Sequence, residues 1–110
     1  MATTFKGKVY ANFNKNTAAA HAVVAAKSGY QVVLHGIMLV ATDPQTITIE
    51  DSDGTNLAGP MDVTAEGGFV LAPSGEPWHV TADGKGLSIL LGNAVQTGGI
   101  VIYEQVSTSN

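Results

Sequence analysis

Apolar residues are concentrated in residues 29–42, GYQVVLHGIMLVAT, the longest apolar run in the chain. The run is rich in β-branched residues, and turn signals bound it on both sides, Ser28-Gly29 before it and Asp43-Pro44 after it. These features predict a strand over residues 30–42. The rest of the fold is expected to be organised around this strand.

Both faces of this predicted strand are apolar. In a regular strand alternate side chains point to opposite faces, so Leu34 and Leu39 are expected on different faces. One face carries Tyr30, Val32, Leu34, Met38 and Val40, and the other carries Val33, His35, Ile37, Leu39 and Ala41. A half-solvated antiparallel sheet alternates apolar with polar residues. We therefore expect one face to pack on the core and the other on a second copy of the chain.

Further strands are predicted wherever alternating or apolar segments lie between turn residues. They cover residues 5–13, 17–26, 45–50, 55–63, 69–72, 78–82, 86–91 and 100–106. Residues 17–26 are rich in alanine, which leaves a short helix as the alternative there. About eight or nine short strands with regular turns predict an all-β antiparallel sandwich or barrel. Residues 1–16 are expected to form an N-terminal strand or arm, and residues 17–110 the sandwich domain.

The composition of the chain narrows the range of possible functions. Only 13% of the 110 residues are charged, against about 25% in typical domains. The chain has five lysines, no arginine and a net charge of −4, which argues against electrostatic binding to nucleic acid or to an anionic membrane. Low charge with 45% hydrophobic residues fits an ordinary β domain covered by Thr, Ser and Asn. It also fits a surface that is partly subunit interface, because interface cores are depleted in charge, and we favour this interpretation.

No targeting or membrane segment is predicted. No window of about 20 residues is continuously apolar, as a membrane-spanning helix requires. Residues 18–26, AAAHAVVAA, contain a histidine and weakly apolar alanines and follow a polar segment. We therefore do not assign them as the core of a secretory signal. The chain has no cysteine, which is compatible with a reducing compartment.

No arrangement of residues indicates catalysis, a metal or a cofactor. A nucleophile motif, a phosphate-binding loop and a dinucleotide-binding motif are all missing from the sequence. His21, His35 and His79 fall on three predicted strands and lack the H-x-H spacing that places two ligands on one strand face. Asp51-Ser52-Asp53-Gly54 is interpreted as a hairpin turn rather than a calcium loop. The chain is expected not to be an enzyme and to hold no metal or cofactor.

Glycine turns and apolar segments follow one another in an order that resembles a known group of proteins. The segments are KSG at 27–29, VVLHG at 32–36, NLAGP at 56–60, GGFV at 67–70, TADGKGLSI at 81–89 and GGIVIYE at 98–104. Over residues 17–106 the chain resembles the small jelly-roll proteins of tailed bacteriophage virions, which decorate or cement capsids or form knobs. Residues 1–16 match no motif of that group.

The resemblance implies a trimeric jelly-roll sandwich without catalytic residues. It implies a capsid decoration or cement protein that binds and stabilises the phage head shell. Its partners would be further copies of itself and the major capsid protein or another virion protein. The location would be the capsid surface of the virion, after synthesis in the host cytoplasm.

Several residues are candidates for the subunit interface or the core on the two-sided strands. They are Leu34, His35, Ile37, Leu39, Ile100, Ile102 and Tyr103. Trp78, the only tryptophan, is a candidate interface or ligand anchor. Copies of His35 that meet at a symmetry axis would make assembly sensitive to acid.

Two alternatives stay open at this point. A carbohydrate- or receptor-binding knob of a phage fibre or tail would use an exposed Trp78 or Tyr10 beside polar groups. A small cupin-like enzyme would need its three histidines to converge on one site.

Overall fold

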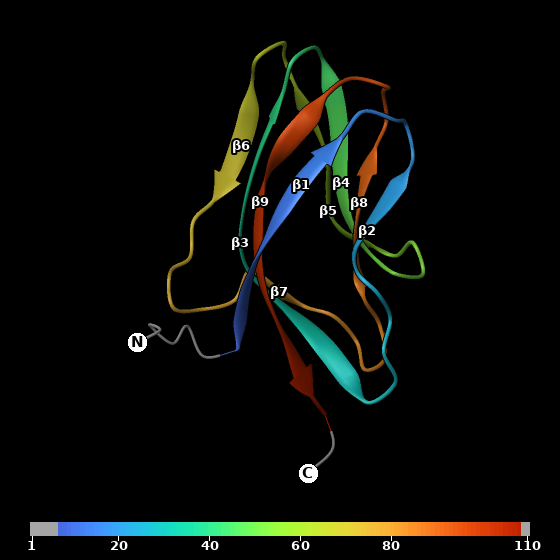
Figure 1. The fold of residues 1–110 in the computed structure, drawn as a ribbon, viewed down its shortest axis with the longest axis vertical. Helices are drawn as coiled ribbons and strands as arrows, with labels where there is room; N and C mark the ends of the chain where they lie inside the picture. The colour runs from blue at the N-terminus through green and yellow to red at the C-terminus, as the bar shows by residue number, and fades with distance from the viewer. Residues whose placement is uncertain (1–6, 109–110) are drawn as a thin grey trace.

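The computed structural model describes residues 7–108, which form an all-β sandwich of two antiparallel sheets (Figure 1). Sheet A has the strand order β1 (Lys8–Lys15), β9 (Thr97–Ser107), β3 (Tyr30–Ala41) and β6 (Gly68–Leu71), and the short β7 (His79–Val80) also pairs with β3. Sheet B has the order β2 (Ala20–Val24), β8 (Leu87–Leu91), β4 (Gln45–Asp51) and β5 (Asn56–Val63). The prediction of an all-β sandwich is confirmed.

Local patterning placed most strands correctly. Residues 20–24 form a strand rather than the alternative helix. The alternation in β4 places Ile47 and Ile49 in the core. β5 is an edge strand whose pairing with β4 is irregular around Gly59-Pro60, as the proline predicts. β9 begins at Thr97, three residues before the strand predicted over residues 100–106.

The N-terminal segment is paired along its length where the structure describes it. β1 runs antiparallel to β9, from Lys8 opposite Glu104 to Lys15 opposite Thr97. Of the N-terminal strand or arm predicted for residues 1–16, the part from Lys8 to Lys15 is a strand of sheet A. Residues 1–6 lie outside the described residues.

The hydrophobic core lies between the sheets and draws on six of the strands in both layers. Its buried members are Phe13, Val24, Val32, Leu34, Ile37, Leu39, Ile47, Ile49, Leu87, Ile89, Leu91 and Val101. Burial of apolar side chains contributes about 25 cal/mol per Å² removed from water, so this cluster is the main source of stability.

A β-bulge in β3 overturns the predicted division of its faces. The pairing with β9 shifts between Leu34, opposite Tyr103, and Gly36, opposite Ile102, so His35 is the extra residue. A bulge of one residue reverses the side-chain parity beyond it. Leu34 and Leu39, with 2% and 0% of their surface exposed, consequently both face the core. The prediction that they lie on opposite faces is wrong.

The same bulge changes which residues form the outer face of β3. Ile37 is in the core with Leu39, whereas His35 is half-buried on the opposite side. Met38 and Val40 are 44% and 48% exposed. The predicted grouping of His35 with Ile37 and Leu39 is therefore wrong. An apolar second face nevertheless exists on this strand, with different members.

Glycines permit close contact between β3 and its neighbours. Gly99 of β9 lies opposite Leu39, and a Cβ atom there would overlap the carbonyl oxygen of Met38. Gly68 of β6 lies opposite Val40, and a Cβ there would overlap the carbonyl oxygen of Leu39. A side chain at either position would force the strands apart.

Candidate interaction surface

Among the described residues, the exposed large hydrophobic side chains gather on sheet A and beside its short strand β7. Within residues 7–108 every one of them belongs to a strand of sheet A or to the residue preceding β7. They are Val9, Tyr10, Met38, Val40, Val70, Trp78, Val80 and Val106. Single exposed hydrophobic residues are common on proteins, but a contiguous group marks an interaction site.

Strand register brings part of this set into one group, which we name the outer patch. Its members are Tyr10, Met38, Val40, Val70, Ile100 and Ile102. Met38 pairs with Val70 of β6 on one side and with Ile100 of β9 on the other. Ile102 pairs with Tyr10 of β1. The outer patch therefore crosses all four main strands of sheet A, on the face that points away from the core.

The outer face of sheet B has a different character. Ala20 and Ala22 on β2 are small and exposed. Thr46 on β4 donates a hydrogen bond of 2.8 Å to Asp62 on β5. Apart from the half-buried Leu90 of β8, which lies opposite Ala20, the side chains named on this face are polar or small. The two outer faces of the sandwich are thus unequal, and only that of sheet A is markedly apolar.

A contact between a histidine and a glutamate borders the outer patch. The extra bulge residue, His35, has its Nε2 atom 3.0 Å from Oε1 of Glu104 on β9. Glu104 also lies opposite Lys8 of β1 in the strand register. Next to His35, Gly36 is buried, and a Cβ there would lie 2.9 Å from Cγ of Pro73. The segment after β6 therefore passes over the bulge, and Gly36 leaves room for it.

Trp78 lies just before β7, with 47% of its surface exposed. Its indole Nε1 donates a hydrogen bond of 2.8 Å to the carbonyl oxygen of Ala72. Its backbone N–H donates one, also of 2.8 Å, to the carbonyl oxygen of Leu34. The ring is thus anchored at its polar edge and exposed over much of its surface.

The remaining candidate residues divide between the two sides of sheet A. Leu34, Ile37 and Leu39 belong to the core. Tyr103 is partly buried and packs against the core. Ile100 and Ile102 are half-buried, and both belong to the outer patch.

The three histidines stay apart in the structure. Nε2 of His21 lies 2.9 Å from the carbonyl oxygen of Thr17, and its ring meets Phe13 edge-on, with 6.0 Å between the ring centroids. Nδ1 of His79 lies 3.3 Å from the carbonyl oxygen of Val80, and His35 pairs with Glu104. In the described part of the chain no group of three or more His, Cys, Asp or Glu residues is placed to hold a metal ion, and no pocket is found.

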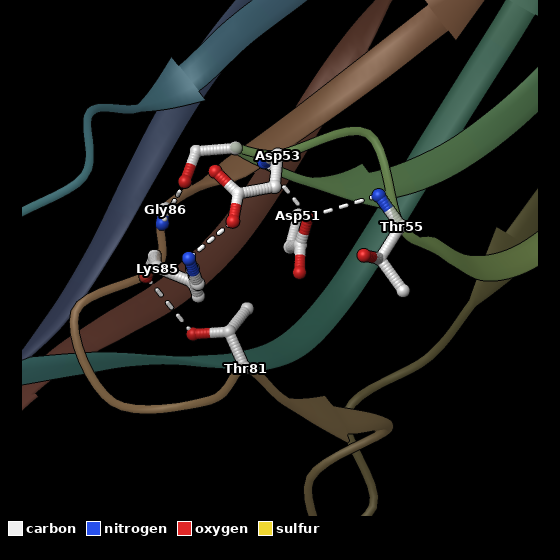
Figure 2. Close-up of polar contacts among 7 residues, drawn as sticks. Asp51, Asp53, Thr55, Thr81, Lys85 and Gly86 are labelled. Atoms are coloured by element: carbon white, nitrogen blue, oxygen red, sulfur yellow. Dashed lines mark hydrogen bonds and ion pairs between the residues drawn. The ribbon is translucent and has the colours of Figure 1, made fainter.

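Asp51, at the end of β4, and Asp53, in the turn that follows, bind groups of the protein itself, as Figure 2 shows. Oδ1 of Asp51 accepts hydrogen bonds from the backbone N–H groups of Asp53 (2.8 Å) and Thr55 (3.0 Å). Asp53 forms an ion pair with Lys85, which lies between β7 and β8. The backbone N–H of Gly86 donates a hydrogen bond of 2.9 Å to Oγ of Ser52. The segment predicted to be a hairpin turn is therefore a turn joined to a neighbouring loop.

These contacts shift two pKa values. Burial raises the pKa of Asp51, but the hydrogen bonds from the Thr55 and Asp53 backbone and the nearby Lys85 outweigh it, and the net pKa lies below its ordinary value. The hydrogen bond and charge of Asp53 raise the pKa of Lys85. Asp51 and Lys85 are therefore both charged at neutral pH, which favours the hydrogen bonds to Asp51 and the ion pair between Asp53 and Lys85.

Reasoning from sequence placed Met38 and Val40 on an apolar strand face but did not select them as interface candidates, and it missed Val70 of β6. The apolar pattern on both faces of residues 30–42 was the available signal for Met38 and Val40. Within the described residues no helix is long and apolar enough to cross a membrane.

The comparisons with protein-family models, with curated proteins and with solved structures found no match to this chain.

Proposed function

We propose that this chain is a structural virion protein, a homotrimeric capsid decoration or cement protein that binds and stabilises a phage head shell. The observation that carries the proposal is the outer patch, an exposed apolar surface on one face of a sandwich in which no pocket is found among the described residues. Such a surface suits contact with other protein chains. The resemblance of residues 17–106 to phage decoration proteins supplies the specific role.

The strand order supports a jelly roll as the form of the sandwich. Strands pair from the chain ends inward: β1 with β9, β2 with β8, β3 with β6 and β7, and β4 with β5. This is the pattern of one long hairpin rolled into two sheets, as in the jelly rolls found in viral capsid proteins among others. Fold alone does not define function, so the surface carries the argument.

The mechanism of stabilisation is thermodynamic linkage. A protein that binds neighbouring shell subunits only in their closed arrangement stabilises that arrangement by RT ln(1 + [L]/Kd). No catalytic group is needed for this role. Rigid antiparallel strands and a closed core offer a surface that changes little on binding.

The proposal is tested by native mass and shell binding. Sedimentation of the purified chain of 11.3 kDa is expected to show a species of about three times that mass, the trimer that the resemblance implies. Empty head shells of the encoding virus, stripped of accessory proteins, are expected to bind it at saturating stoichiometry and to resist heat better. A chain that leaves both the sedimentation and the melting of the shells unchanged would overturn the proposal.

A second candidate is a carbohydrate- or receptor-binding knob, which the exposed ring of Trp78 favours. Sugars stack on exposed aromatic rings, and the ring here is already fixed by the hydrogen bond to Ala72. Trp78 is the only tryptophan, so its fluorescence reports binding directly. A saturable change with one class of glycan supports the knob, whereas no response across a broad glycan panel argues against it.

A further inference from the structure

The outer face of sheet A carries almost no net charge, although the chain is acidic. Glu104 is the only acidic residue in the strands of sheet A, and it faces Lys8 in the register and pairs with His35. The other acidic residues lie in sheet B or in loops. Glu104 is thus the single carboxylate within the strands of this face, which limits repulsion between carboxylates when two copies bring these faces together.

The dimensions of the face indicate how strongly two copies would bind. Four strands at about 4.8 Å spacing give a width of about 19 Å, and the stretch of β9 from Gly98 to Val106 gives a length of about 27 Å. The face thus measures about 500 Å², and two faces in contact bury about 1,000 Å². This is at the lower limit for a specific interface. Association should therefore be reversible and depend on concentration.

The inequality of the two outer faces limits what can cover the outer patch. A contact between unlike surfaces of two copies would place the outer patch against polar groups such as Thr46 and Asp62 on sheet B. A contact of the patch with the same patch removes apolar surface from water on both sides. Two whole faces stack in this way only around a two-fold axis, whereas around a three-fold axis each copy sets one edge of its patch against the other edge of its neighbour's patch.

We infer that the outer patch is covered by the outer patch of another copy of this chain. This inference rests on the self-association in the proposed function and names the surface responsible. Met38 lies at its centre, between Val70 and Ile100. The His35–Glu104 pair lies at its border, where a polar rim is expected.

The test is sedimentation of the full chain from about 1 to 200 µM, a range chosen to span the weak affinity expected of a small interface. The substitution Met38→Glu places a charge at the centre of the patch and is expected to raise the concentration of half-association at least about tenfold. The control Ala22→Glu places the same charge on the exposed outer face of sheet B and is expected to leave it unchanged. Circular dichroism establishes that both variants are folded.

A second measurement does not depend on a disruptive variant. The chain has no cysteine, so Met38→Cys and Ala22→Cys each provide one thiol. Maleimide should modify Met38→Cys more slowly as protein concentration rises, and Ala22→Cys at a constant rate. The inference would be overturned if maleimide modified Met38→Cys at the same rate at all protein concentrations. It would also be overturned if Ala22→Glu weakened self-association and Met38→Glu did not.

The outcomes separate this inference from the proposed function. A chain that associates through the outer patch and does not bind shells supports the inference and overturns the capsid role. A chain that stays monomeric up to 200 µM and still binds shells overturns the inference and the homotrimer of the proposed function, and it leaves shell binding supported.

Discussion

The bulge at His35 makes a prediction about three single substitutions in β3. Leu34→Ala and Leu39→Ala each empty a site in the core, since these side chains are 2% and 0% exposed. Buried leucines replaced by alanine typically cost about 2.7–5 kcal/mol, and we expect about 3 kcal/mol for each. Met38 is 44% exposed, so Met38→Ala removes little buried apolar surface. We expect it to lower the free energy of unfolding by about 1 kcal/mol.

Urea unfolding followed by circular dichroism measures these differences. The experiment is done at about 1 µM, where a small interface adds little to stability. With a slope of about 1.5 kcal/mol per molar urea for a chain of this size, the leucine variants should lose about 2 M in midpoint and the Met38 variant less than 1 M. A regular strand would place Leu34 with Met38 and away from Leu39. If either leucine costs no more than Met38, the bulge and the assignment of the two faces are wrong.

Two further predictions concern the turn and the glycines. The pKa of Asp51 is below its ordinary value of 3.8 in the folded protein, so its contribution to stability is complete above that value and is lost as the pH falls through the folded value. Urea midpoints measured from about pH 5 to pH 2 should therefore fall less steeply for Asp51→Asn than for the wild type, and parallel profiles would contradict this. Gly99→Ala places a Cβ atom on the carbonyl oxygen of Met38 and should cost at least about 3 kcal/mol or prevent folding. Gly98→Ala is the matched control, because its Cβ would lie 3.4 Å from the nearest atom, the carbonyl oxygen of Phe13. Thermal unfolding compares the two variants, and equal melting temperatures would refute the packing argument.

The sequence predicted strands best where periodicity and turn chemistry agree. In β4, alternating Ile and Thr residues end at an Asp-Gly turn, and only one register buries Ile47 and Ile49. β8 behaves in the same way, with Leu87, Ile89 and Leu91 facing the core. Both strands have one clearly apolar face, so burial fixes their orientation.

The same reasoning fails in β3 because both of its faces are apolar. Any register of such a strand buries hydrophobic side chains, so the pattern does not reveal a one-residue bulge. The bulge depends on long-range pairing with Tyr103 and Ile102 of β9. The existence of an apolar outer face could be predicted from composition, but its members required the register of four strands.

Other features have no local signal in the sequence. β7 has only two residues, His79 and Val80, and its pairing with β3 decides its position. The ion pair between Asp53 and Lys85 joins segments that are 32 residues apart. Contacts of this kind follow from the topology, which local patterns do not specify.

The pairing of β1 with β9 has a consequence for engineering. Lys8, at the start of β1, lies opposite Glu104, close to the end of β9 at Ser107. Polypeptides fused before β1 and after β9 would therefore emerge from the same pole of the sandwich. The opposite end of β9, at Gly98, adjoins Val40 of the outer patch. Peptides fused before β1 and after β9 would project away from the end of the sandwich that carries Val40. Self-associating copies could therefore display two different peptides side by side.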